Sequence, residues 1–235
     1  MKTLGLIGGM SWESTTAYYQ HLNRLARDRL GGLHSARLVV WSVDFAQVAT
    51  MQAVGDWDGA TAVMIDAARR LESAGAEALM ICANTMHLMA DEVAAAVAIP
   101  LIHVVDATAT AVRAAGATRP LLLATRFTME KPFYRDRLSA GGVEARIPGA
   151  ADRERLHAMI FDELVQGRLE PVSRAGLVDI VCRAVADGGV DSVILGCTEF
   201  ALLVAPADLP VPSFDTTQIH ARAGIDFALG NGDRE

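Results

Sequence analysis

Two stretches decide the fold, GAEALMICANT at Gly75–Thr85 and GVDSVILGCTE at Gly189–Glu199. Their glycines align, Glu77 aligns with Asp191, and the apolar segments match at a constant offset of 114 residues, which is 189 minus 75. The amphipathic segments just before them also match, AARRLESAG with CRAVADGG. Because the offset extends over successive strand–helix units, it indicates an internal duplication rather than the chance likeness of any two such units.

Short apolar runs alternate with longer amphipathic runs around these stretches. This alternation predicts strand–helix–strand units and parallel sheets. The expected strands are Thr3–Ile7, Ala36–Val43, Ala78–Cys82, Leu101–Val104, Pro120–Ala124, Val143–Ile147, Ser192–Leu195 and a short piece near Val211–Phe214. The expected helices, most of which end at a glycine, are Ser14–Leu30 (capped by Ser14 or Thr15), Asp58–Ala74, Ala90–Ala98, Asp106–Ala115, Lys131–Ala140, Asp152–Val165 and Pro171–Ala186.

We therefore expect an α/β protein of two pseudo-symmetric parallel-sheet domains with the active site between them. Residues 1–98 and 211–235 are expected to form the first half, to which the last strand and helix return, and residues 99–210 the second. Ligands bind beyond the carboxyl ends of parallel strands. Four segments bring small and polar residues to such ends, GGMSWEST, CANTMH, ATRFTM and GCTEF. Helix N-termini and hydroxyl donors there favour a carboxylate ligand.

Composition argues against several classes of function. The 235 residues are 51% hydrophobic with a net charge of −7, and no basic stripe indicates nucleic-acid binding. The most apolar run, Val93–Val105, is broken by Pro100 and His103 and is too short to span a membrane. Six histidines show no ligand spacing, so no metal is expected. Three scattered cysteines and no signal peptide favour reduced thiols in the cytoplasm.

Cys197 is the strongest catalytic candidate. It follows Gly196 at a strand end and precedes Thr198 and Glu199, which are expected to be the first residues of a helix. The positive field of a helix N-terminus lowers the pKa of a thiol. A thiolate is what a carbon-acid base or a nucleophile requires.

The repeat indicates whether Cys82 occupies a catalytic position. Cys197 aligns with Ala83 (197 minus 114), whereas Cys82 aligns with Gly196. Because side chains alternate faces along a strand, the one-residue slip directs Cys82 away from the ligand-binding edge and into the core. Cys182, in a helix with apolar neighbours, is also expected to pack in the core.

Weaker candidates are polar residues at the other strand ends. Asn84 and Thr85 are donors at a helix start, Thr125 and Thr128 form a T-x-x-T turn, and Gln52 lies in an expected polar loop. Each is equally compatible with binding substrate and with capping a turn. Glu199 is likewise compatible with a helix cap. The glycines near residue 8 match neither nucleotide-binding pattern.

Together, GGMSWEST, SVDF, NTMH, TRFTME, the F-D-E-L-x-x-G pattern at Phe161–Gly167 and GCTE resemble the aspartate/glutamate racemase superfamily over the whole chain. The resemblance is closest to the aspartate/glutamate and broad-specificity amino-acid racemases. It implies a homodimer with the site between two α/β halves, and racemisation without pyridoxal phosphate or another cofactor. One cysteine from each half, in C-N-T and in G-C-T, removes or returns the α-proton.

The resemblance makes Cys197 the second catalytic thiol. The implied substrate shell comprises Met10, Gln52, Ala83, Asn84, Thr85, Thr125, Thr128, Thr198 and Glu199. The first catalytic position holds Ala83, which has no proton to exchange, whereas some close members have threonine there. Gln166 stands where acidic-amino-acid racemases can place lysine, which weakens the expectation that the substrate carries a side-chain carboxylate.

The leading hypothesis is an amino-acid racemase that acts on a small amino-acid or carboxylate substrate through Cys197. The opposite-face proton must then come from water, Thr85 or a displaced Cys82. A rival is one-sided chemistry with a single cysteine, such as decarboxylation or isomerisation of small dicarboxylates. A third possibility is a degenerate, non-catalytic homologue that binds amino acids.

Overall fold

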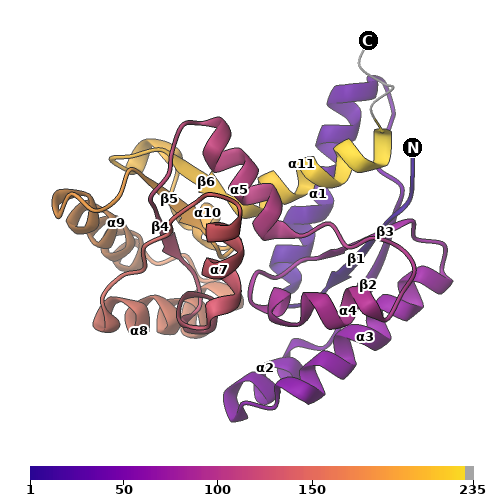
Figure 1. The fold of residues 1–235 in the computed structure, drawn as a ribbon, viewed down its shortest axis with the longest axis horizontal. Coiled ribbons are helices and arrows are strands. Elements are labelled where there is room, and N and C mark those ends of the chain that lie inside the picture. Colours follow the sequence, from indigo (N-terminus) through magenta and orange to yellow (C-terminus); the bar gives the residue numbers. More distant parts are fainter. Residues whose placement is uncertain (231–235) are drawn as a thin grey trace. The chain divides into compact units, whose positions relative to one another are not determined.

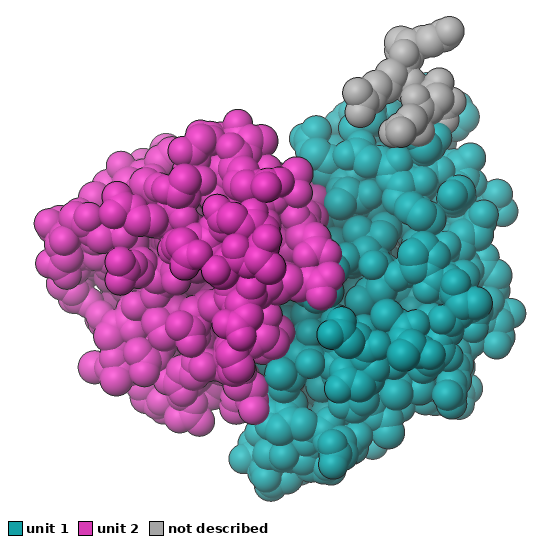
Figure 2. Space-filling model, in the orientation of Figure 1, with its two compact units in different colours: residues 1–103, 220–235 teal, residues 104–219 magenta. Residues whose placement is uncertain are grey.

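The computed structural model describes residues 1–230. These residues form two compact units, Met1–His103 together with the segment from His220 onward, and Val104–Ile219 (Figure 2). It remains a prediction that the chain forms two separate folding halves divided at residues 98 and 99, with the C-terminal helix belonging to the first.

The first unit is a three-stranded parallel sheet covered on both faces. Its strands are β1 (Leu4–Gly8), β2 (Leu38–Ser42) and β3 (Ala78–Ile81), in the order β2-β1-β3. Apolar residues of α1 (Trp12–Leu30) and α11 (Thr216–Leu229) pack on one face. Those of α2 (Phe45–Val54) and α3 (Trp57–Ser73) pack on the other (Figure 1). A 3₁₀ turn, Thr85–Met89, and α4 (Ala90–Ala95) follow β3.

The second unit repeats this plan around one core. Its strands are β4 (Pro120–Leu123), β5 (Ser192–Leu195) and β6 (Ser213–Asp215), parallel and in the order β4-β5-β6. Its helices are α5 (Val104–Ala114), α6 (Arg126–Glu130), α7 (Pro132–Ala140), α8 (Ala150–Ala158), α9 (Pro171–Ala186) and α10 (Phe200–Leu203). Helix α8 continues into a π-helical turn, Met159–Glu163, and two short 3₁₀ turns are Leu164–Gln166 and Pro206–Asp208.

The duplication is visible in the strands that it predicted. β3 and β5 occupy the same positions at the offset of 114, because 78 aligns with 192 and 81 with 195. The two aligned acidic residues also make equivalent hydrogen bonds to the backbone. Glu77 accepts a hydrogen bond from the backbone N–H of Thr3 at 2.8 Å, just before β1. Asp191 accepts hydrogen bonds from Thr118 and Arg119 at 2.8 and 3.0 Å, just before β4. The predicted α/β class with two parallel sheets is confirmed.

Two predicted strands are reduced to single bridges. Leu101 pairs with Leu79, and Arg146 pairs with Leu121, each as one isolated parallel bridge. Pro100 lacks a backbone N–H, and α5 begins as early as Val104, so the first segment cannot extend its ladder. The segment near Arg146 runs into Pro148, which has the same effect at that edge.

Two other expectations, one for a strand and one for a loop, are wrong. The strand near residue 213 pairs with β5 in the second sheet and does not return to the first half, to which only α11 returns. The expected polar loop around Gln52 is helix α2, which Asp44 caps by accepting a hydrogen bond from Ala46 N at 3.1 Å. Among residues 1–230, we find no helix that is both long enough and apolar enough to cross a bilayer.

Candidate functional site

The turn between β1 and α1 is held by its own hydroxyl groups. Ser11 caps α1 by accepting a hydrogen bond from Ser14 N at 3.2 Å, so the predicted caps Ser14 and Thr15 are wrong by one turn. Thr15 Oγ1 accepts from Gly9 N at 2.8 Å and donates to Ser11 O at 3.0 Å. Met10 is 7% exposed and packs in the core cluster beneath α2 and α3. These hydroxyls therefore shape the turn that carries Met10.

Gln52 lies beside the turn that follows β3. It is buried on α2, and its Nε2 donates to Met86 Sδ at 3.1 Å. Met86 directly follows Thr85 in the 3₁₀ turn. Asn84 and Thr85 are each 8% exposed at the start of that turn. The structure thus brings together Gln52, Asn84 and Thr85, which the sequence had singled out separately.

Cys82 and Ala83 pack into different cores, as the repeat predicted. Cys82 is fully buried in the cluster formed with α1 and α11, and burial raises the pKa of its thiol. Ala83 packs against the cluster on the α2 and α3 face. Cys82 is therefore an unreactive thiol on the far side of the sheet from Ala83. Cys182, by contrast, is exposed on α9, so its expected burial is wrong.

His87 fixes the backbone of the turn after β3. Its Nδ1 lies 3.0 Å from the carbonyl oxygen of Ala83. A carbonyl oxygen only accepts, so Nδ1 carries the proton. The ring packs edge-on to those of His103 and His220, with centroids 4.6 and 5.7 Å away. The spacing of four residues between His87 and Ala83 is the signal for this anchoring role.

His220 ties α11 to the same part of the first unit. Its Nε2 donates to the carbonyl oxygen of Ile102 at 2.7 Å, so its Nδ1 accepts from the hydroxyl of Tyr18 at 2.8 Å. Burial, reinforced by His103, lowers the pKa of His220 to about 4 despite the opposing effect of the Ile102 carbonyl. His220 is therefore a neutral structural link at neutral pH.

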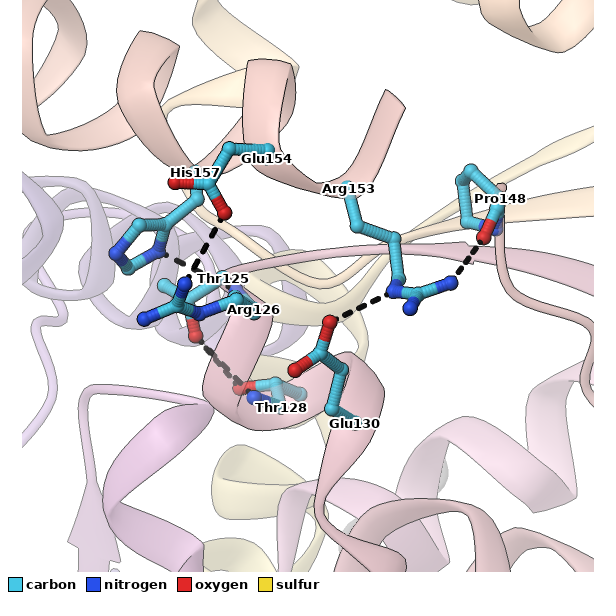
Figure 3. A network of polar contacts seen from close by, with 8 residues as sticks. All are labelled: Thr125, Arg126, Thr128, Glu130, Pro148, Arg153, Glu154 and His157. Carbon is cyan, nitrogen blue, oxygen red and sulfur yellow. Dashed lines mark hydrogen bonds and ion pairs between the residues drawn. The ribbon is translucent and has the colours of Figure 1, made fainter. Parts of the chain in front are cut away.

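In the second unit, Thr125 and Thr128 form a capping pair at the end of β4 (Figure 3). Thr125 Oγ1 accepts from Thr128 N at 3.3 Å, and the two hydroxyl oxygens are 3.2 Å apart. Thr128 is fully buried and Thr125 is 9% exposed. Of the two, Thr125 is better placed to contact a ligand, while Thr128 sets the turn.

The turn is held on α8 by contacts that the sequence did not reveal (Figure 3). Arg126 N donates to His157 Nδ1 at 3.3 Å, and Arg126 pairs with Glu154 at 3.1 Å. Arg153 pairs with Glu130 at 2.8 Å. Burial, aided by the Arg126 charge, lowers the pKa of His157 against the pull of nearby carboxylates. The neutral His157 can therefore accept the Arg126 N–H.

Cys197 and Glu199 form a direct pair after β5. The thiol donates to Glu199 Oε2 at 2.9 Å. Glu199 is 3% exposed, whereas Cys197 is half-buried. The turn lies against the end of β4, because Gly196 N donates to the carbonyl of Leu123 at 2.7 Å. Cys197 and Thr125 therefore follow neighbouring strand ends in one sheet.

The expected lowering of the Cys197 pKa is wrong in direction. Burial is the largest cause that raises this pKa, followed by the charge of Glu199 and the hydrogen bond to it. The backbone N–H groups of Glu199 and Phe200 act the other way but are weaker. Thr198 and Glu199 form a turn rather than a first helical turn, and α10 begins only at Phe200 and has four residues. The field of a helix N-terminus is correspondingly small.

Thr217 supports this turn from the start of α11. Its hydroxyl lies 2.9 Å from that of Thr198, and it is fully buried. Its neighbour Thr216 donates to the carbonyl of Leu195 at 3.0 Å. Both contacts join residues about twenty positions apart, so no local pattern could have revealed them. The candidate residues thus form one group at the carboxyl edge of each sheet.

The chain matches the family model of Asp/Glu/hydantoin racemases over residues 7–224. A candidate Asp/Glu racemase from Yersinia pestis is 46% identical, with a TM-score of 0.89 over 98% of this chain and 100% of that one. An aspartate racemase homologue from Pyrococcus horikoshii is 34% identical, with a TM-score of 0.85 over 98% and 100%. An uncharacterised Pectobacterium carotovorum protein is 29% identical over 44% of this chain and 67% of its own length. This chain belongs to the Asp/Glu/hydantoin racemase family.

Proposed function

We propose that this protein is a cofactor-independent amino-acid racemase in which Cys197 is a thiol acid/base. The observation that carries the proposal is the hydrogen bond from Cys197 to the buried Glu199, 2.9 Å long, at the carboxyl end of β5. It supplies a proton donor and an acceptor for that proton in one turn of a racemase-family chain. General acid–base catalysis requires such a pair.

Glu199 converts the resting thiol into a base. Transfer of the Sγ proton to Glu199 Oε2 produces a thiolate and a neutral carboxylic acid. The thiolate then accepts the α-proton of the substrate and becomes a thiol again. For the reverse stereochemical direction, the resting thiol donates its proton to the planar carbanion, and the thiolate that remains regains a proton from water, because the resting Glu199 carboxylate carries none. The raised pKa of Cys197 favours this protonated resting form.

The opposite face of the substrate requires a second proton donor. Ala83, at the position equivalent to Cys197, has none, and Cys82 packs fully buried in the other core of the first unit. This packing argues for water or the Thr85 hydroxyl over Cys82. Racemisation through such a weak second acid is expected to be slower than exchange on the Cys197 side.

The substrate is proposed to be a small amino acid bound through its carboxylate. Hydroxyl, amide and backbone donors of Asn84, Thr85, Thr125 and Thr198 suit that group. Gln166 donates to the carbonyl of Phe161 at 3.2 Å and adds no positive charge, so no side-chain carboxylate is required of the substrate. A homodimeric assembly and a cytoplasmic location belong to the same proposal.

The test is α-proton exchange in deuterated water, followed by proton NMR over a panel of L- and D-amino acids. The proposal expects deuterium at Cα of at least one amino acid, with slower appearance of its enantiomer. Ala83→Cys is expected to accelerate racemisation more than exchange. A panel on which the folded protein catalyses neither process would refute the proposal for those substrates.

A second candidate function is favoured by Ala83. Decarboxylation of a disubstituted malonate breaks a carbon–carbon bond, releases carbon dioxide and needs only one proton, delivered by Cys197. Carbon dioxide release from substituted malonates, without amino-acid exchange, would select this function over racemisation.

A further inference from the structure

The second unit carries a basic hollow at the amino end of its sheet. The hollow measures about 710 Å³ and includes three arginines, Arg119, Arg135 and Arg146, with Glu144 as its one acidic member. Its lining therefore has two more positive than negative charges, in a chain whose net charge is −7. A volume of this size lies within the usual range of roughly 300–1,000 Å³ for small-molecule sites.

The charges of these three arginines are not neutralised by ion pairs with described residues. Within residues 1–230, no carboxylate lies within ion-pair distance of Arg119, Arg135 or Arg146. Glu144 is engaged instead by the Ser139 hydroxyl, at 2.7 Å. In an adjoining hollow, also lined by Arg146, Arg183 is neutralised by two aspartates.

One donor of the Arg135 side chain has no partner within the described residues. Its Nε is shielded from solvent and has no hydrogen-bond partner among the described residues. Solvent does not reach this Nε, so other atoms of Arg135 line the hollow. Gly142 lines the same hollow, and a side chain there would meet Arg113, which adds a fourth arginine close by.

The hollow is separate from the candidate catalytic turn. Thr118 and Arg119 precede β4, whereas Thr125 follows it. The four residues of β4 span roughly 13 Å at about 3.3 Å per residue. A ligand in the hollow therefore does not contact Cys197, which follows the carboxyl end of β5.

We propose that this hollow is a binding site for a small molecule that carries a phosphate or diphosphate group. Guanidinium groups bind phosphate oxygens through paired N–H donors, and a dianion or trianion matches the excess positive charge. The limited size of the hollow and the acidic character of the whole chain favour a small ligand over an extended polyanion such as a nucleic acid. This site is independent of the proposed racemase activity.

Isothermal titration of the full chain with sodium pyrophosphate tests the proposal, at an ionic strength held constant with sodium chloride. Saturable binding is expected, weaker for inorganic phosphate and absent for acetate. Arg119→Gln and Arg146→Gln are each expected to weaken pyrophosphate binding by about tenfold or more, because each removes charge-assisted hydrogen bonds. Arg119→Lys keeps the charge but loses the paired donors, so its loss should be smaller.

Two controls make the outcome decisive. Arg69→Gln removes an exposed charge from α3 in the first unit, and Cys197→Ala alters the candidate catalytic turn. Both should bind pyrophosphate as the wild type does. No saturable binding by wild-type protein would overturn the proposal, as would unchanged affinity in both hollow variants or loss of affinity in Cys197→Ala. Tighter binding of a single-stranded oligonucleotide than of pyrophosphate would overturn the small-molecule assignment.

Discussion

The Glu199→Gln substitution is the sharpest probe of the Cys197 turn. The two side chains are 2.9 Å apart, and Glu199 is 3% exposed. A thiolate and a carboxylate at this separation repel each other by about 6 kcal/mol at an effective dielectric constant of roughly 20. This is an upper limit, because the backbone N–H groups of Glu199 and Phe200 stabilise the thiolate and offset part of the repulsion. Glutamine removes the charge and offers an N–H donor to the thiolate.

Glu199→Gln should therefore lower the pKa of Cys197 and increase its thiolate fraction. We expect iodoacetamide to alkylate Cys197 at least about tenfold faster at pH 7, with the midpoint of the rate profile shifted to lower pH. Mass spectrometry of the Cys197 peptide measures this rate. The exposed Cys182 in the same sample provides an internal reference.

Glu130→Gln is the matched control, because the Glu130 carboxylate pairs with Arg153 and not with the thiol. It should leave the Cys197 profile unchanged. A Cys197 profile that stays in place or moves to higher pH in Glu199→Gln would show that Glu199 is not what holds this thiol protonated. Burial alone would then account for its raised pKa.

Three further predictions concern the residues that hold the site. Gly9→Ala should destabilise the fold by about 2 kcal/mol more than Gly31→Ala, as measured by urea unfolding. Both glycines have positive φ, 92° and 76°, but only at Gly9 would an added Cβ meet backbone, at 2.2 Å. Equal losses of stability in the two variants would contradict this reasoning. Thr217→Val should cost about 1–3 kcal/mol by leaving the Thr198 hydroxyl without its partner, and Thr217→Ser should recover most of it. The pKa of His220 is lowered to about 4, so its contribution to the free energy of unfolding is complete above roughly pH 6.5 and falls by about 3 kcal/mol as the pH drops towards 4. His220→Gln can keep both hydrogen bonds and should flatten the pH dependence of the unfolding free energy between these pH values. An unchanged slope would refute the assignment.

The periodic features of the chain could be predicted because they depend on local chemistry. The sequence located β5 to the residue and β3 to within one residue at its end. The repeat also aligned Glu77 with Asp191, and each carboxylate accepts hydrogen bonds from the backbone just before a strand. It also placed Cys82 away from Ala83, because alternation along an extended chain needs no knowledge of the partner elements. These inferences required only the order of residues.

Edges and short helices were less predictable. Whether Leu101 and Arg146 lie in strands depends on how many ladder bonds their neighbours allow, and each makes only one bridge. Helix α2 had readable signals, since Asp44 caps it and Gly55 ends it in the left-handed region with φ 76°. The segment shows no clear polar face, so its residue pattern did not predict an amphipathic helix.

The chemistry of Cys197 depended on tertiary contacts. The sequence placed a thiol at a strand end but also predicted a helix start at Thr198, from which a lowered pKa followed. In the structure a turn brings Glu199 back onto the thiol and reverses the sign. The hydrogen bond that supports Thr198 comes from Thr217, which lies 19 residues further along the chain. Such contacts have no periodic signature.

The most direct test of the account compares α-deuterium incorporation by the wild type, Cys197→Ala and Cys82→Ala over the amino-acid panel, with circular dichroism confirming that each variant is folded. The account predicts that Cys197→Ala loses at least about 100-fold of the exchange rate, the lower range for a general acid–base residue. Cys82→Ala should retain the wild-type rate within a few-fold. Exchange that persists in Cys197→Ala but disappears in folded Cys82→Ala would contradict it.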